Sequence, residues 1–262
     1  MTTRRDDGSA GDADYGRMAP PYARFRRPDP RIARQILDAL GEARTVLNVG
    51  AGAGSYEPTD RDVTAVEPSA TMRAQRPPHL SPAIDACAEA LPFPDAAFDA
   101  SLTTFSIHQW RDLGAGLAEM RRVTRGPVVI LTCDPDAMAS FWLPHYCPEV
   151  TAVEASRFPP ITDVVRRLGD VAEIRPVPVP LDCVDGFNEA YYGRPEGLLD
   201  PEARLSCSSW SFLAPDVVDR FAATLSRDLA DGSWDRRFGH YRTLPQLDGP
   251  LRLIVSRPPS QG

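Results

Sequence analysis

Short apolar runs alternate with longer amphipathic stretches through the first half of the chain. Four runs rich in valine, leucine and threonine lie at residues 45–49, 63–66, 98–103 and 128–132. Ahead of the last run, Leu113, Leu117 and Met120 recur on one face of a helix expected from about Asp112 to Val123. Strands separated by helices predict strand-helix-strand units and a mainly parallel sheet.

A helix is also expected before the first run, and less regular structure after residue 134. Asp29 can cap free backbone amides, Pro30 suits the first helical position, and Gly41 can end the helix. Further on, prolines interrupt the pattern, and the elements expected are a short helix at 161–168, a strand at 173–179, a helix at 217–229 and a buried closing strand at 251–255. We therefore expect insertions on the core fold after residue 134.

Length and composition indicate one globular domain. The 262 residues, 42% of them hydrophobic, can bury one core, and no apolar run approaches the roughly eighteen residues of a membrane span. The polar, glycine-containing residues 1–18 are expected to form a flexible tail ahead of a domain at 19–262. No apolar stretch follows the first arginines, so we expect a cytoplasmic protein, and the five cysteines, without a C-x-x-C pair, are expected to be free thiols.

Charge narrows the classes of function. The net charge is −7 and no basic stripe dominates, although arginines gather between Arg24 and Arg34, so a nucleic-acid partner is not expected. All 29 cationic residues are arginine. Without lysine the chain has neither a Schiff-base lysine nor a P-loop lysine, which argues against pyridoxal-phosphate enzymes and Walker-type nucleotide hydrolases.

The most informative segment is an apolar strand that runs into a glycine-rich turn, VLNVGAGAGS at residues 46–55. Glycines there let the backbone approach a ligand closely. Ser55 stands where the dinucleotide fingerprint G-x-G-x-x-G has its third glycine, which argues against NAD. Glu67 follows the next apolar run and is either a ribose-binding carboxylate or a solvated acid at a strand end.

Three further motifs give these residues a family resemblance. Glu67-Pro68-Ser69 is followed by Met72, the segment 88–93 reads AEALPF, and Phe98-Asp99 leads through the run at 98–103 to His108-Gln109-Trp110. Together with the glycine turn, this pattern over residues 45–134 resembles class I S-adenosylmethionine (SAM)-dependent methyltransferases, within the subfamily of small-molecule enzymes similar to methyltransferase type 11.

The resemblance implies an α/β fold and a cofactor site. The expected fold is a seven-stranded, mostly parallel Rossmann-like sheet with helices on both faces, an antiparallel last strand and a helical cap. The SAM-binding core would cover about 43–134, and the substrate and cap elements about 19–40 and 135–215. The cofactor contacts implied are Tyr22, Gly50, Ala51, Gly52, Gly54, Glu67, Pro68, Met72, Ala86, Cys87, Ala88, Thr104, Phe105 and Ser106.

Two residues depart from the family pattern. Asn48 replaces the acidic residue usual two positions before the first loop glycine, so we expect a weaker or water-mediated contact toward the methionine end of the cofactor. Cys87 stands where an aspartate commonly accepts the adenine amino group, and a thiol is a poorer acceptor. Adenine recognition is therefore expected to rest on backbone groups near Ala88.

Methyl transfer from a sulfonium is an in-line displacement that needs alignment rather than a metal. If the acceptor must lose a proton, His108, which follows the run at 98–103, is the candidate base, although it could instead simply pack or cap there. Aromatic residues outside the core motifs are candidates for the wall of a substrate pocket, with His145 beside them. The substrate contacts expected are Tyr22, His108, Trp142, His145, Tyr191 and Tyr192.

Three functions remain open at this point. The first is methyl transfer from SAM, with S-adenosylhomocysteine as product, to oxygen, nitrogen or carbon of a small molecule in bacterial specialised metabolism. The second is an oxidoreductase that uses NAD or NADP on a related fold. The third is a protein that binds SAM without catalysis. Membrane and nucleic-acid partners are not expected for any of them.

Overall fold

The computed structural model describes residues 24–169 and 171–258 and contains one central sheet. Its strand order is β2-β1-β3-β4-β8-β5, with bounds β1 Thr45–Val49, β2 Asp62–Val66, β3 Ala100–Thr104, β4 Val128–Cys133, β5 Val171–Pro176 and β8 Leu251–Arg257. The first four strands are parallel, and β8 runs antiparallel to both β4 and β5. The predicted α/β fold, with a mostly parallel sheet and an antiparallel last strand, is confirmed.

The sheet has six strands in the described residues where seven were expected. At the β2 edge, the Ile84 amide donates to Ala65 O over 2.8 Å and the Glu67 amide donates to Ile84 O over 2.9 Å, and the bridge extends no further. Residues 77–83 read PPHLSPA, and prolines lack the amide hydrogen that a longer strand needs. A separate antiparallel pair joins β6 (Val179–Pro180) to β7 (Gln246–Leu247).

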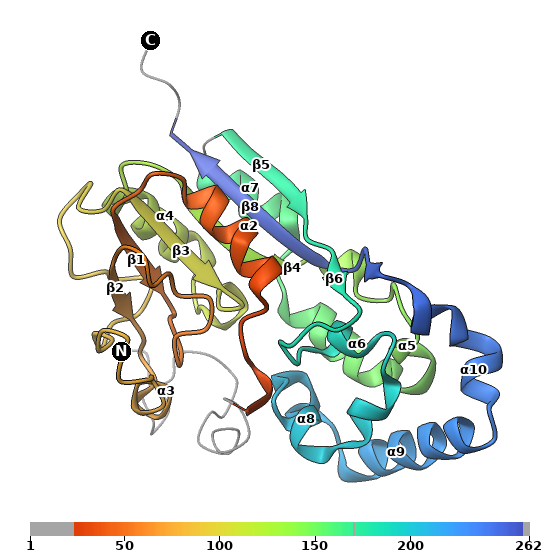
Figure 1. Ribbon diagram of the computed structural model, residues 1–262. Coiled ribbons are helices and arrows are strands. Elements are labelled where there is room, and N and C mark those ends of the chain that lie inside the picture. The colour runs from red at the N-terminus through yellow and green to blue at the C-terminus, as the bar shows by residue number, and fades with distance from the viewer. Residues whose placement is uncertain (1–23, 170, 259–262) are drawn as a thin grey trace.

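Helices cover both faces of the sheet because alternate strand residues point to opposite sides. Val46 and Val129 join the apolar cluster of α2 (Pro30–Leu40), whereas Leu47 and Val128 join that of α4 (Leu113–Val123). The helix α7 (Ile161–Leu168) packs beside α4, as Figure 1 shows. The expected caps are present, since Asp29 accepts the Arg31 amide hydrogen.

A helical cap lies beyond one end of the sheet (Figure 1). Its α-helices are α5 Leu143–Tyr146, α6 Pro148–Arg157, α8 Pro201–Leu205, α9 Pro215–Ala230 and α10 Ser233–Phe238. Short 3-10 turns join them or follow strands, namely η1 Ile107–Gln109, η2 Pro135–Ala137, η3 Asn188–Tyr191, η4 Pro195–Leu199, η5 Ser208–Phe212 and η6 Gly239–Thr243. Prolines at the first positions of α6, α8 and α9 start these helices rather than break them. None of the described helices is both long and apolar enough to cross a bilayer.

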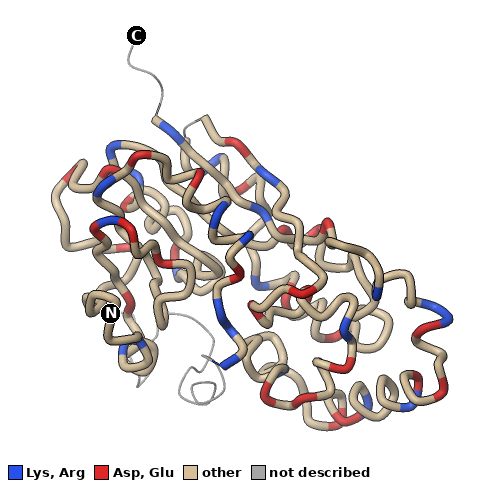
Figure 2. The backbone as a smooth tube through the Cα atoms, viewed as in Figure 1, with Lys and Arg blue, Asp and Glu red and all other residues tan. Residues whose placement is uncertain are grey.

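The segment that leads into α2 carries the arginines that gather in the sequence (Figure 2). Acidic partners come from distant parts of the chain, and the pairs are Arg24 with Glu202 at 2.7 Å, Arg26 with Asp185 at 2.6 Å and Arg31 with Asp182 at 2.6 Å. These ion pairs tie the N-terminal segment to the cap. The Arg26 side chain is thus mostly buried in its ion pair, whereas those of Arg24 and Arg31 stay exposed beside their carboxylates.

Candidate active site

The glycine turn after β1 is held closely against β2 and the end of β3. Gly50 and Gly52 have φ angles of 67° and 51°, in the left-handed region that favours glycine. A Cβ added at Gly50 would lie 1.9 Å from Ser106 Oγ, so no larger residue fits. The Ala51 amide donates to Val66 O over 3.0 Å, which ties the turn to the last residue of β2.

Glu67 follows β2 and organises the turn. Its carboxylate accepts hydrogen bonds from the Gly52 and Ser69 amides, each over 2.8 Å. Ser69 in turn caps the helix α3 (Ala70–Ala74) by accepting the Met72 amide hydrogen. A Cβ at Gly52 would lie 3.3 Å from Met72 Cε, so the turn, the acid and the methionine are close together as the motifs predict.

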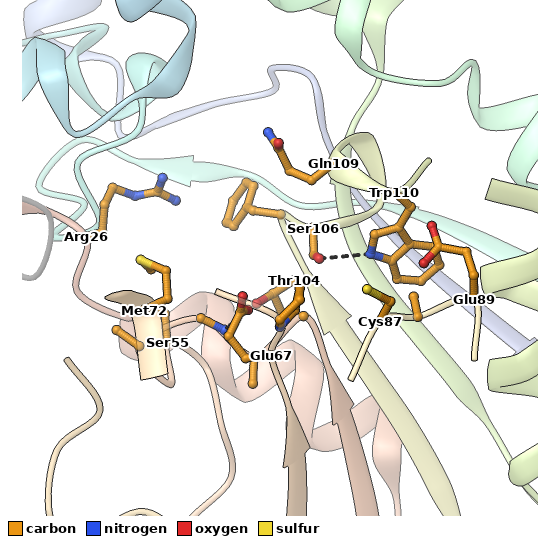
Figure 3. A pocket seen from close by; sticks show the side chains of 17 residues that line it. Arg26, Ser55, Glu67, Met72, Cys87, Glu89, Thr104, Ser106, Gln109 and Trp110 are labelled. Carbon is orange, nitrogen blue, oxygen red and sulfur yellow. Dashed lines mark hydrogen bonds between the residues drawn. The ribbon is translucent and has the colours of Figure 1, made fainter. Parts of the chain in front are cut away.

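These elements enclose a pocket at the carboxyl ends of the parallel strands, where ligands bind in open α/β sheets. Its lining comes from the glycine turn, the start of α3, the segment after Ile84 and the end of β3, with Arg26 on the opposite side in Figure 3. The residues are Arg26, Gly50, Ala51, Gly52, Ala53, Ser55, Glu67, Pro68, Met72, Cys87, Ala88, Glu89, Thr104, Phe105, Ser106, Gln109 and Trp110. We call this space the cofactor pocket.

Of the expected cofactor contacts that the structure describes, all but two line this pocket. Gly54 is packed away from it, since a Cβ there would lie 2.3 Å from Leu80 Cδ1. Ala86 is buried next to the lining residue Cys87 and does not itself line the pocket. Tyr22 lies outside the described residues.

Asn48 lies beneath the turn and does not line the pocket. Its Nδ2 donates to Glu57 Oε2 over 2.9 Å, and Glu57 pairs with Arg76 at 2.8 Å. The three side chains form a buried network, because those of Glu57 and Arg76 are only 1% and 4% exposed. An acidic side chain, that of Glu57, therefore lies beside Asn48, but it pairs with Arg76 and does not line the cofactor pocket.

Trp110 and Gln109 are pocket residues that the sequence motif contained but did not assign. The Trp110 indole Nε1 donates to Ser106 Oγ over 3.0 Å, the contact drawn in Figure 3. Its ring fills the space above Gly116, where an added Cβ would lie 2.5 Å from Trp110 Cε3. The small residue in α4 and the aromatic residue after η1 are therefore complementary, and a helix-face pattern alone does not show such a pair.

A second cavity adjoins the cofactor pocket and shares Arg26 and Phe105 with it. It lies between the end of β3, the end of β4 and the cap, and its residues are Arg26, Phe105, His108, Cys133, Glu154, Phe158, Phe187, Glu189, Ser206, Cys207 and Ser208. We call it the acceptor chamber. Sequence reasoning placed only His108 there as a substrate residue, because the others come from elements far apart in the chain.

His108 stacks on Phe158, with ring centroids 4.2 Å apart and planes at 28°. The Arg26 guanidinium lies 5.0 Å from the centre of the Phe105 ring while its Nε donates to Asp185 over 2.6 Å. The chamber therefore has aromatic walls on several sides. Among the described residues that line the chamber, the one arginine is Arg26, and its partner Asp185 is fully buried.

The chamber also holds two acidic residues, Glu154 from α6 and Glu189 from η3. Burial and the neighbouring Glu154 carboxylate raise the pKa of Glu189 to about 8. Burial likewise raises the pKa of Glu154, against a hydrogen bond from Asn188 at 2.6 Å that lowers it. The two carboxyl groups are thus near enough to affect each other's ionisation.

The other expected substrate residues within the described part of the chain lie outside both cavities. Trp142 is buried in the cap and its Nε1 donates to Tyr192 O over 2.9 Å, while the Tyr192 hydroxyl donates to Leu244 O. Exposed His145 contacts Arg237, with 2.9 Å between the two nitrogens. Tyr191 packs on Gly197. These side chains form the core and surface of the cap, and a part for them in substrate binding stays a prediction.

The comparisons with known proteins agree with this site. A family model described as a methyltransferase domain matches residues 47–130. A solved structure of a protein from Anabaena variabilis, described as a methyltransferase from an antibiotic biosynthesis pathway, is 31% identical, with a TM-score of 0.83 over 89% of this chain and 99% of that one. The chain belongs to the class I SAM-dependent methyltransferases.

Two more distant relatives show how far the likeness extends. The methyltransferase is 35% identical over 121 residues to a malonyl-[acyl-carrier protein] O-methyltransferase of Pseudescherichia vulneris, a match over 43% of this chain and about half, 48%, of that protein. A SAM-dependent methyltransferase structure from Thermotoga maritima shares the fold, with a TM-score of 0.52 at 15% identity over 93% of this chain and 94% of that one.

The cofactor pocket fits SAM on its own chemistry. Gly50 and Gly52 leave the backbone bare where a ligand must approach, and Glu67 places a carboxylate 7% exposed at the end of β2, as a ribose diol requires. Met72 and Ala88 add apolar surface on which a purine can lie. At these residues the pocket is compatible with the cofactor of the family.

Proposed function

We propose that this methyltransferase transfers the methyl group of SAM to a small molecule that enters the acceptor chamber. The contiguity of the two cavities carries the proposal, since both are lined by Arg26 and Phe105. A methyl group can pass directly between ligands only if donor and acceptor lie in contact. The acceptor chamber is buried beneath the cap, which supports a small acceptor rather than an exposed macromolecular chain.

Within the cofactor pocket we assign each expected residue a contact. Glu67 would accept hydrogen bonds from the ribose hydroxyls, Met72 would pack on the adenine, and Cys87 and Ala88 would lie at its edge. The glycine turn and the segment Thr104–Ser106 would hold the methionine part. Bound SAM supplies a methyl group already activated by its sulfonium. The protein's residues therefore have to orient the two reactants and exclude water from them.

His108 remains the proposed base for an acceptor that must lose a proton, because it faces the acceptor chamber. Its stacking on Phe158 fixes the plane of the imidazole. A role in specialised metabolism is supported by the Anabaena variabilis relative, whose description places it in antibiotic biosynthesis. Both assignments are part of the proposal.

Calorimetry tests the cofactor assignment first. We expect S-adenosylhomocysteine to bind the purified protein, and Glu67→Gln to weaken that binding by about 1–3 kcal/mol, as for a lost hydrogen bond to a charged group. Glu173→Gln is the matched control, because Glu173 lies exposed on β5 and pairs with Arg175. Binding of NADH without binding of S-adenosylhomocysteine would contradict the proposed function.

A further inference from the structure

The acceptor chamber has an acidic side chain whose carboxylate is left open toward the cavity. Glu189 is 4% exposed and lines the chamber, yet no other described residue donates a hydrogen bond to its side chain. Among the described residues, the one donor to this carboxylate is the backbone amide of Glu189 itself, which leaves a buried charge poorly compensated, and a ligand that donates hydrogen bonds would relieve that cost. The side chain therefore points to a ligand that donates hydrogen bonds or carries positive charge.

Glu154 adds a second carboxylate on the same cavity. Asn188 donates to Glu154 Oε2 over 2.6 Å, which holds the side chain in place. Two neighbouring carboxylates in a buried space repel each other, and they retain a proton between them until a cation relieves the repulsion. The pair thus favours a cationic occupant over a neutral or anionic one.

Arg26 and Arg157 offset this preference only in part, because both lower the pKa of Glu154 while burial still leaves it raised. Arg26 pairs with buried Asp185, and Arg157, from the same helix as Glu154, donates to Ser208 Oγ over 2.8 Å. The other titratable groups that face the pair are His108 and the thiols of Cys133 and Cys207. Burial raises the pKa of Cys207 to about 12, so that thiol is neutral at ordinary pH.

The walls suit an organic cation better than a metal ion. Phe105, Phe158 and Phe187 line the chamber, and aromatic faces attract alkylammonium groups. Across the described ranges, no group of three or more His, Cys, Asp or Glu side chains is arranged to hold a metal ion. An ammonium group needs only the two carboxylates and the rings.

We propose that the methyl acceptor is an amine, which enters the acceptor chamber as a cation and is held by the carboxylates of Glu154 and Glu189. This inference rests on the proposed function and names the acceptor class of the same site. For this acceptor Glu189 takes the place of His108 as the base: one N–H proton of the ammonium passes to the Glu189 carboxylate, which frees the nitrogen lone pair. A carbon–nitrogen bond then forms as the carbon–sulfur bond of the donor breaks, and its electron pair leaves with sulfur.

The product of this step is a methylated ammonium ion, which again carries one positive charge. The carboxylates and the aromatic walls stabilise that charge, and the proton on Glu189 passes to solvent. With a pKa of about 8, Glu189 is closer to an alkylammonium in proton affinity than an ordinary glutamate is. Proton transfer from the bound cation is therefore less uphill than it would be to a solvated carboxylate.

The binding test uses a pair of probes that differ only in charge, choline and its carbon analogue 3,3-dimethyl-1-butanol. By calorimetry we expect choline to bind at least about tenfold more tightly than the alcohol, from charge attraction and cation–aromatic contact together. Glu189→Gln and Glu154→Gln should each reduce choline binding by about tenfold or more, and the control Glu173→Gln should not. Equal binding of both probes, or choline binding unchanged in both variants, would overturn the inference.

The wild-type protein offers a second measurement that needs no variant to fold. Choline does not titrate, so its affinity reports the ionisation of the chamber. Because the cation competes with the proton on the carboxylate pair, affinity should rise with pH by up to about tenfold per unit below pH 8 and then level off. A flat profile from pH 6 to 9 would overturn the inference.

Turnover separates this inference from the proposed function on which it rests. With SAM present, primary and secondary amines should release S-adenosylhomocysteine, whereas matched alcohols and phenols should not. Methylation of alcohols but not amines would refute the amine assignment and leave the methyltransferase function standing. If S-adenosylhomocysteine fails to bind at all, the proposed function fails, and the choline measurements still decide whether the chamber selects cations.

Discussion

The buried network beneath the glycine turn makes Asn48→Asp a sharp test of how this chain departs from its family. Asn48 is 1% exposed and donates to the Glu57 carboxylate over 2.9 Å. An aspartate there would restore the acidic residue usual in the family, yet it would place a second carboxylate against Glu57. We expect the substitution to destabilise the fold.

The magnitude follows from two limits. Loss of a hydrogen bond to a charged acceptor costs about 1.5–3 kcal/mol. Repulsion adds to this, but the new aspartate can escape it by taking up a proton, which at pH 7 costs about 4 kcal/mol for a group of ordinary pKa near 4. The expected loss at pH 7 is therefore about 2–4 kcal/mol.

The pH dependence carries a definite sign. Burial beside Glu57 raises the pKa of the introduced aspartate in the folded state above its unfolded value. The folded state then binds more protons, so the destabilisation is small below about pH 4 and grows as pH rises. Urea-unfolding midpoints of the variant and the wild type should diverge between pH 4 and pH 7.

A double-mutant cycle with Glu57→Gln isolates the cause. Glu57→Gln alone removes the buried partner of Arg76 and is expected to destabilise as well. The aspartate at 48 should then replace the missing charge, so the double variant should be more stable than the two single losses predict by about 2 kcal/mol. An Asn48→Asp protein as stable as wild type at pH 7, or additive losses, would refute the reasoning.

Three further outcomes are expected. Gly50→Ala should abolish binding of S-adenosylhomocysteine, since the added Cβ would lie 1.9 Å from Ser106 Oγ. The control is Gly41→Ala, where φ is also positive at 57° but an added Cβ would meet nothing within 4 Å. That control should leave binding unchanged and cost only about 1–2 kcal/mol of stability. Cys87→Asp should tighten S-adenosylhomocysteine by about 1 kcal/mol through a better acceptor for the adenine amino group, and calorimetry showing no gain would refute that contact. The Arg125 guanidinium holds the pKa of Asp99 well below its ordinary value, so the stability that Asp99 contributes is present at neutral pH and is lost in acid. In Asp99→Asn, the urea-unfolding midpoint should therefore fall less steeply as the pH is lowered. A fall as steep as in the wild type would show that other groups cause the acid sensitivity.

Local sequence patterns determined the core of the fold and the positions of most pocket residues. Each core strand is a short apolar run, and the glycine turn and Glu67 follow their strands directly. Because parallel strands place their carboxyl ends at one edge, residues that follow such strands meet without further information. The same reasoning placed Thr104 and Ser106 beside the turn, and in the structure both line the cofactor pocket together with it.

Only the tertiary structure decided which residues line the acceptor chamber and how many strands the sheet has. Glu154 and Glu189 belong to separate cap elements, and their approach depends on long-range packing that no local pattern encodes. The sequence allowed Trp142 a place in a pocket wall or in a core, and the structure buries it in the cap, because burial is a property of the whole fold and not of a residue type. Beside β2, Ile84 forms one bridge and not a longer strand, because neighbouring prolines cannot donate the hydrogen bonds that a strand needs.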